Sequence, residues 1–100
     1  MDKRTLHYDL VRIKALIADL EVAAFTKSAL DGGRAMGLTT AEMLHVMDGL
    51  SREDFYKSMT TYADHRIWQD VYFAETPVGR WAYIKVTLRD GAPVIQFKEK

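Results

Sequence analysis

The sequence predicts an α+β protein in which N-terminal helices pack on a mainly antiparallel β-sheet. Apolar residues recur at helical spacing near the N-terminus, capping residues mark two further helices, and strand-like segments follow from residue 55 onward. Helices first and strands afterwards are typical of α+β architecture. The length of 100 residues suits one small domain, so we expect residues 1–100 to form a single unit.

The first helix is expected near the N-terminus, where apolar residues at spacings of three and four share one helical face. These residues are Leu6, Leu10, Ile13, Ile17 and Leu20. Thr5 is the expected N-cap, and Asp9 lies early in the helix, where the macrodipole favours an acid. The apolar run that follows, residues 22–25, is expected to form a short strand.

A second helix is expected over residues 27–36, because Thr26 is a suitable N-cap and Gly37 a suitable terminator. The pair Gly32 and Gly33 lies inside this segment. Each glycine disfavours a helix by roughly 1 kcal/mol relative to alanine, so the pair weakens the prediction.

A third helix is expected after Thr39, because Thr39 and Glu42 have the spacing of a capping box. Beyond residue 50 the character changes, and residues 55–62 and 67–73 have the composition of strands. Residues 51–54 would also cap a short helix, so a helical start to that region stays open.

The last twenty residues predict a β-hairpin, because polar and apolar side chains alternate on both sides of Asp90 and Gly91, a strong turn signal. A two-residue turn places Tyr83 opposite Lys98, whereas a four-residue loop places Lys85 opposite Lys98. Both registers keep the apolar row together. Both also place a phenol and two ammonium groups on the other face, which suits an anion such as phosphate.

Composition narrows the class of protein. The net charge is zero, which argues against a protein that coats nucleic acid through bulk charge, although bases outnumber acids from residue 57 onward. The sequence has no cysteine, which excludes disulfides and thiolate chemistry and fits a reducing cytoplasm. Neither a signal peptide nor an apolar stretch of membrane-spanning length is visible, so we expect a cytoplasmic protein.

Common active-site motifs are absent, and a polar cluster in the C-terminal half remains. The histidines lie too far apart in sequence to predict a metal site, and no serine elbow or glycine-rich phosphate loop occurs. The remaining candidates are Lys57, Tyr62, His65, Gln69, Tyr83, Lys85 and Lys98. Such groups suit RNA cleavage at a 2′-hydroxyl, which needs a base, an acid and cations. Equally, they are typical of the solvated face of a sheet.

Two central runs resemble the MqsR toxin family, the motility quorum-sensing regulator toxins of bacteria. They are residues 54–62, DFYKSMTTY, and residues 64–72, DHRIWQDVY. The opening Lys3-Arg4-Thr5 with His7 and the final residues 97–100 also look like that family. The resemblance implies a RelE-like α+β fold and a type II toxin that cuts mRNA at GC-containing sites without a metal or other cofactor.

The resemblance also implies site residues. By motif position, the family's functional residues fall on Lys57, Gln69, Tyr83 and Lys98. Weaker candidates for substrate binding are Met59, Tyr62, His65 and Lys85. The family does not rest its catalysis on the histidine, so His65 is expected to contact substrate or shape a turn.

The implied partner is the antitoxin MqsA, which carries a zinc-binding domain and a helix-turn-helix domain. The metal would belong to that partner, and DNA would be reached only through it. One departure is that residues 73–82 contain fewer arginines than better-known members, which predicts weaker RNA binding. Two alternatives therefore stay open: an antitoxin-binding module without cleavage that tunes promoter repression, and an RNA-binding domain without catalysis.

Overall fold

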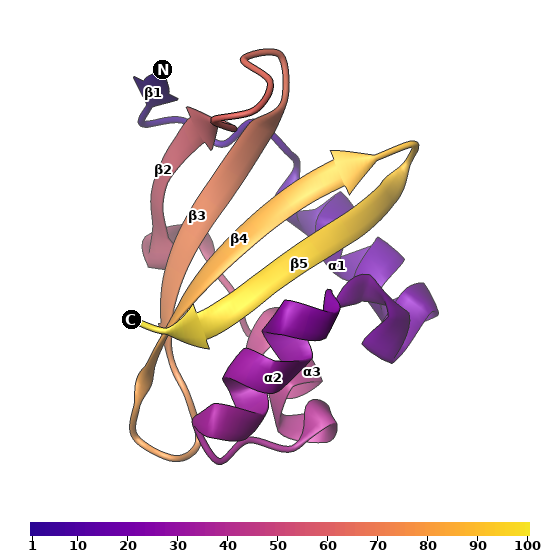
Figure 1. The fold of residues 1–100 in the computed structure, drawn as a ribbon, viewed down its shortest axis with the longest axis vertical. Coiled ribbons are helices and arrows are strands. Elements are labelled where there is room, and N and C mark those ends of the chain that lie inside the picture. Colours follow the sequence, from indigo (N-terminus) through magenta and orange to yellow (C-terminus); the bar gives the residue numbers. More distant parts are fainter.

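The computed structural model describes residues 1–100 and contains one sheet with the strand order β1-β2-β3-β4-β5, in which every neighbouring pair is antiparallel (Figure 1). The elements are β1 (Asp2–Lys3), α1 (Leu10–Leu20), the 3₁₀ helix η1 (Glu21–Ala24), α2 (Lys27–Ala35), α3 (Thr40–Asp48), the 3₁₀ helix η2 (Arg52–Asp54), β2 (Phe55–Thr60), β3 (Trp68–Glu75), β4 (Trp81–Arg89) and β5 (Ala92–Glu99). The predicted α+β class with N-terminal helices on an antiparallel sheet is confirmed.

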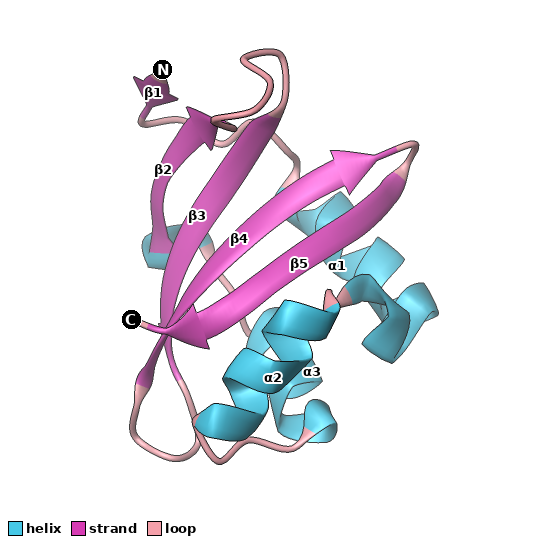
Figure 2. Cartoon of the chain, in the orientation of Figure 1, coloured by secondary structure: helices cyan, strands magenta, loops and turns pink.

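The three α-helices pack on the same face of the sheet, and the core lies between the helices and that face (Figure 2). The strand residues buried in this core are Tyr72 and Ala74 of β3, Ala82, Ile84 and Val86 of β4, and Ile95 and Phe97 of β5. They meet apolar residues of all three helices, including Ile13, Ala29 and Met43. The other face of the sheet has no helix over it, and we call it the open face.

Helix α1 begins later than predicted, because Asp9 rather than Thr5 is its N-cap. The chain just before the helix is held by the fully buried carboxylate of Asp70 on β3. This carboxylate accepts hydrogen bonds from the backbone N–H groups of His7 at 3.1 Å and Tyr8 at 2.9 Å. These N–H groups satisfy a buried charge instead of joining a helix, so the helical pattern starts after them.

The prediction of a strand over residues 22–25 is wrong. The segment forms η1, and Phe25 makes only one isolated parallel bridge, to Ile95 of β5. Glu21 adopts a positive φ of 53°, which redirects the chain at the end of α1 before the 3₁₀ turn. A short apolar run is compatible with either a strand or a buried helical turn. Here the 3₁₀ turn buries Ala24 and Phe25 against the core.

The glycine pair inside α2 has a packing role. A Cβ atom on Gly32 would lie 2.2 Å from the backbone oxygen of Phe97 on β5, and one on Gly33 would lie 2.2 Å from the sulfur of Met43 on α3. The glycines therefore let α2 approach β5 and α3 closely, and that packing outweighs their weak helix propensity. Gly37 follows the helix with a φ of 86°, as expected of a glycine terminator.

The N-caps predicted for the second and third helices are confirmed. Thr26 accepts a hydrogen bond from the backbone of Ala29, and Thr39 and Glu42 form a reciprocal capping box. Ser51 and Asp54 do cap a short helix, η2 (Arg52–Asp54), before β2 begins. The helical interpretation is thus correct for Arg52–Asp54, and the strand interpretation is correct for the segment that follows it.

The hairpin of β4 and β5 has the register that a two-residue turn predicts. Asp90 and Gly91 both have positive φ values, 52° and 79°, as a type I′ turn requires. Tyr83 is paired with Lys98 across the two strands. The alternative register, which would place Lys85 opposite Lys98, is wrong.

Candidate active site on the open face of the sheet

The residues predicted to be catalytic, Lys57, Gln69, Tyr83 and Lys98, lie on the open face. Tyr83 and Lys98 are directly opposite each other on β4 and β5. Successive side chains on a strand point to opposite faces, and Ile84 is fully buried against the helices, so Tyr83 points away from them. The strand registers place the other two residues on the same face as Tyr83.

The side chains of the open face form three rows of directly paired residues. They are Met59–Gln69, Lys57–Val71–Lys85–Gln96 and Phe73–Tyr83–Lys98. Neighbouring rows are two residues apart along each strand, which is roughly 7 Å. Lys57 and Lys85 therefore flank Val71, which is fully buried although it faces away from the helices. Its burial shows that the long side chains around it cover the sheet.

A β-bulge in β2 determines which way Lys57 points. Phe55 pairs with Tyr72, whereas Lys57 pairs with Val71, so Tyr56 is an extra residue between them. Without the extra residue, simple alternation would put Lys57 on the same face as Phe55, which packs against the core. The bulge thus brings both Tyr56 and Lys57 to the open face.

Two lysines lie close to the Tyr83 ring. The Nζ atoms of Lys98 and Lys85 are 5.4 and 5.8 Å from the ring centroid. Burial lowers the pKa of Lys85, and the positive charge of Lys98 lowers it further. Two crowded ammonium groups beside a phenol form a site that an anion would stabilise, because its charge relieves their mutual repulsion.

The third lysine of the site is paired within the chain. Nζ of Lys57 donates a hydrogen bond of 3.1 Å to the carboxylate of Asp2, and the Lys57 side chain is only 21% exposed. Strand β1 positions this acid, because Asp2 pairs with Met59 of β2. The Lys57 ammonium holds the pKa of Asp2 below its usual value. The sequence did not predict β1, since two residues are too few to show a strand pattern.

The predicted substrate-binding residues lie together at one end of the open face. They line a cavity of about 600 Å³ with Gln69: Met59, Tyr62, His65 and Lys85. Tyr62 and His65 belong to the loop between β2 and β3, in which Arg66 donates to the carboxylate of Asp64 at 3.1 Å. Tyr62 is fully exposed. The loop residues and the row that contains Gln69 therefore line the same cavity.

Sequence reasoning missed two aromatic residues of the open face, Tyr56 and Phe73. Their rings stack with centroids 4.7 Å apart and an angle of 24° between planes, and the Phe73 ring is 5.5 Å from that of Tyr83. Phe73 continues the alternation that starts at Gln69, so that pattern was available as a signal. The sequence contains no such signal for Tyr56, because the orientation of its side chain depends on the bulge.

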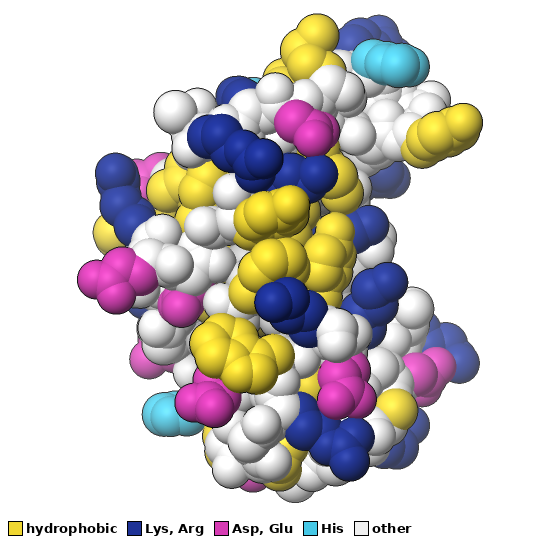
Figure 3. Space-filling view, turned by 90° about the vertical axis from the view of Figure 1, so that its left-hand side faces the viewer, with side chains coloured by type: hydrophobic (Ala, Val, Ile, Leu, Met, Phe, Trp, Pro, Cys, Tyr) yellow, Lys and Arg dark blue, Asp and Glu magenta, His cyan; other side chains and the backbone are white.

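The surface around these rings is cationic. The space-filling view shows hydrophobic side chains gathered in the middle of this side of the molecule, with Lys and Arg side chains around them (Figure 3). Lys57, Lys98 and Lys100 each place Nζ near one of the three rings. Stacked rings bordered by positive charge are typical of surfaces that bind single-stranded nucleic acid.

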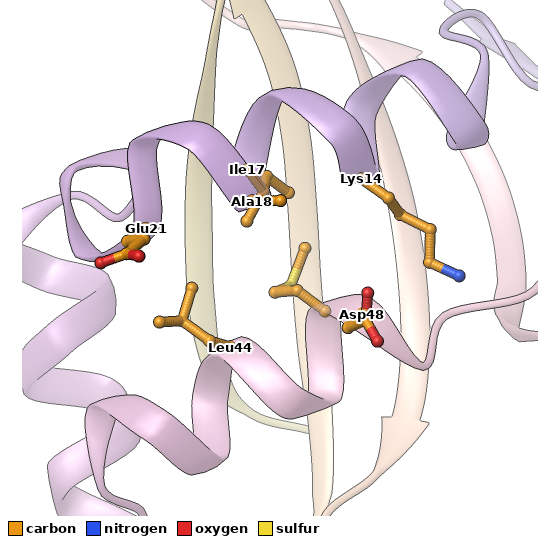
Figure 4. Close-up of a pocket in the computed structure, with 7 residues that line it drawn as sticks. Lys14, Ile17, Ala18, Glu21, Leu44 and Asp48 are labelled. Atoms are coloured by element: carbon orange, nitrogen blue, oxygen red, sulfur yellow. The ribbon is translucent and has the colours of Figure 1, made fainter.

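A separate cavity of about 350 Å³ lies between α1 and α3, where Ile17, Leu44 and Asp48 line it among others (Figure 4). It contains none of the predicted site residues. Lys14 at its rim donates a hydrogen bond of 2.6 Å to the backbone oxygen of Leu50. No three His, Asp or Glu side chains are grouped to hold a metal ion, and no helix is long and apolar enough to cross a membrane.

The fold and this face define a small α+β protein with a sheet surface suited to the phosphates and bases of a nucleic acid. The sequence matches the family described as "Motility quorum-sensing regulator, toxin of MqsA" over residues 5–99. It is also 45% identical over 100 residues to the mRNA interferase toxin MqsR of Escherichia coli (strain K12), and the match covers 100% of both chains. The chain belongs to the MqsR toxin family, as the resemblance predicted.

Proposed function

We propose that this chain is the toxin of a type II toxin–antitoxin pair and an endoribonuclease that cuts mRNA, which stops translation and growth. The observation that carries the proposal is that Lys57, Gln69, Tyr83 and Lys98 share the open face with Lys85. Membership of the MqsR toxin family supports the same activity. All 100 residues act as one toxin domain.

The reaction is attack of a ribose 2′-hydroxyl on the adjacent phosphorus. A base takes the 2′-hydroxyl proton as the new O–P bond forms, and an acid gives a proton to the 5′-oxygen as its bond to phosphorus breaks. The products are a 2′,3′-cyclic phosphate and a 5′-hydroxyl. One proton is removed and one is donated, so the step balances, and in this proposal side chains perform both transfers without a metal ion.

The geometry supports a division of roles. Lys57 and Lys98 hold the scissile phosphate and stabilise the negative charge that develops on it. Tyr83, which lies opposite Lys98, protonates the leaving 5′-oxygen or positions the 2′-hydroxyl. Gln69 donates a hydrogen bond to the RNA backbone from the wall of its cavity.

Lys85 is our candidate for the base. It lies between the Tyr83 ring and the cavity that contains Gln69, so it can reach both parts of the site. A free lysine titrates near 10.4 and is almost entirely protonated at neutral pH. Burial and the neighbouring Lys98 charge lower the pKa of Lys85, which increases the fraction that can accept a proton.

The cavity at the end of the face holds nucleotides beside the cut. Met59, Tyr62 and His65 line it and are placed to contact bases, and they would contribute to a preference for GC-containing sites. In cells, the chain acts in the cytoplasm and is neutralised by an MqsA-type antitoxin with zinc-binding and helix-turn-helix domains. Contact with DNA occurs only through that antitoxin.

The test is incubation of the purified chain with a defined mRNA in EDTA, followed by mapping of cut sites and end groups. We expect specific cuts with 2′,3′-cyclic phosphate and 5′-hydroxyl ends, and their loss in Lys98→Ala with the fold retained. A 5′-phosphate product would contradict the mechanism. Absence of cutting by the folded wild type, with and without ribosomes, would instead favour an antitoxin-binding role.

A further inference from the structure

Three aromatic rings form a continuous series across β2, β3 and β4. Tyr56 stacks on Phe73, and Phe73 lies at a tilt of 44° to Tyr83. We call Tyr56, Phe73 and Tyr83 the aromatic ladder. None of the three belongs to the hydrophobic core between helices and sheet, and Tyr56 is 42% exposed. The ladder is therefore not explained by core packing.

Cations accompany each ring of the ladder. Nζ of Lys57 lies 5.4 Å from the Tyr56 centroid, that of Lys100 lies 4.4 Å from Phe73, and that of Lys98 lies 5.4 Å from Tyr83. Single-stranded RNA presents flat bases on one side and phosphates on the other, at regular intervals. An ammonium group lies over each ring, so a base that stacks on a ring takes the place of the ammonium group, which then meets a neighbouring phosphate.

We propose that Phe73 and Tyr56 form a base-stacking subsite that holds unpaired nucleobases on one side of the scissile phosphate. The inference rests on the proposed endoribonuclease function and goes beyond it, because neither residue takes part in the chemical step. Tyr83 beside Lys98 forms the β4–β5 end of the ladder, and Tyr56 beside Lys57 forms its β2 end. The substrate strand therefore crosses the sheet from β5 toward β2.

Base stacking is insensitive to sequence, because every base has an aromatic face. The subsite therefore strengthens binding of RNA that is unpaired beside the cut, and it does not select the cut motif. Residues in the cavity around Gln69 are then left to read the bases. This division predicts that a hairpin which pairs the flanking bases protects an otherwise suitable site.

The first experiment uses short RNA oligonucleotides with one cut site and measures kcat and KM for Phe73→Leu and Tyr56→Leu. Loss of stacking to one base corresponds to a decrease in kcat/KM of about tenfold. We expect this decrease to come from KM, with kcat unchanged. Tyr56→Phe keeps the ring and is expected to match wild type, and Trp81→Leu removes an exposed aromatic of the same face that lies outside the ladder.

A second series replaces single flanking nucleotides by abasic ones. In the wild type, one abasic position is expected to reduce kcat/KM about as much as Phe73→Leu does. In Phe73→Leu the same abasic position is expected to have no further effect, because the stacking contact is already lost. The assignment would be overturned if the abasic position and Phe73→Leu reduced kcat/KM additively. It would also be overturned if Trp81→Leu reduced kcat/KM as much as Phe73→Leu does.

Binding of RNA with a 2′-deoxy nucleotide at the cut site separates this inference from the proposed function. Such RNA cannot be cut, so its dissociation constant reports binding without the chemical step, and the difference between wild type and Phe73→Leu reports the subsite. Weaker binding to Phe73→Leu than to wild type supports the subsite even if cleavage is never detected. Unchanged binding together with normal cleavage would overturn the subsite and leave the endoribonuclease intact. Circular dichroism and thermal unfolding confirm that each variant is folded.

Discussion

Asp2 and Lys57 form an ion pair of 3.1 Å at the edge of the open face, so the first strand places a carboxylate on a cation of the candidate site. A carboxylate and a phosphate present similar oxygens to an ammonium group. RNA that binds Lys57 must therefore displace Asp2 or share the ammonium with it. The pair links the extreme N-terminus to the site, although 55 residues separate the two in sequence.

This competition predicts that Asp2→Asn binds RNA more tightly. Exposed ion pairs are weak, so the expected decrease in KM is at most about fivefold at low salt. Steady-state kinetics on an oligonucleotide with one cut site measures it. Asp19→Asn makes the same change in net charge on α1, away from the site, and is the control. A lower kcat in Asp2→Asn with KM unchanged would show instead that Asp2 holds Lys57 in its active position.

The crowding of Lys85 by Lys98 predicts a measurable coupling between their charges. In Lys98→Gln the positive neighbour is gone, so the pKa of Lys85 should rise. It should not recover its ordinary value, because burial is the larger cause of the shift and remains. NMR titration of the lysine side-chain carbons follows this change.

Lys98→Arg is the matched control for that titration, because it keeps the positive charge and should keep the pKa of Lys85 low. Lys85→Gln identifies the resonance. The same Lys85 titration in wild type and Lys98→Gln would contradict the coupling, and the case for Lys85 as the base would then rest on position alone.

A direct phosphate contact by Lys57 predicts a change in salt dependence. Each phosphate neutralised on a single strand contributes about 0.7 to the slope of log affinity against log salt concentration. Lys57→Gln is expected to reduce the slope by about that amount, measured by RNA binding at several salt concentrations. Lys27→Gln removes a lysine that is paired with Asp31 on α2, and should leave the slope unchanged. An unaltered slope in Lys57→Gln would exclude this contact.

The glycine pair of α2 predicts a difference in stability between two otherwise identical substitutions. Gly32→Ala forces a Cβ against the backbone of β5 next to Lys98, so it should lower the free energy of unfolding by about 1–3 kcal/mol despite better helix propensity. Gly33→Ala meets only the flexible end of Met43, so its effect should be smaller. Urea unfolding measures both.

Gly32→Ala should also reduce cleavage if it folds, because the Cα atom of Lys98 lies 3.3 Å from the position of the added Cβ. A Gly32→Ala variant as stable as wild type would show that β5 can shift to accommodate the added Cβ. In that case the close approach has no energetic consequence, and α2 does not help to position Lys98.

Several elements were predictable because their signals are local. Helix caps at Thr26 and Thr39 depend on residues within one turn, and the Asp90-Gly91 turn defines its own hairpin. The pairing of Tyr83 with Lys98 follows from that turn by counting. The start of α1 was not predictable, since it depends on Asp70, a buried residue more than sixty positions away.

Local signals were sufficient to predict the fold class, the caps at Thr26 and Thr39, the final hairpin and hence the shared face of Tyr83 and Lys98, because periodicity and turn chemistry act over short distances. That Lys57 and Tyr56 face the same way as Gln69 depends on strand pairing, because a bulge shifts the register and reverses the alternation. The tertiary structure likewise brings Asp2 to Lys57 and aligns the rings of the aromatic ladder across three strands. Those relationships join distant segments, and strand pairing alone sets their geometry.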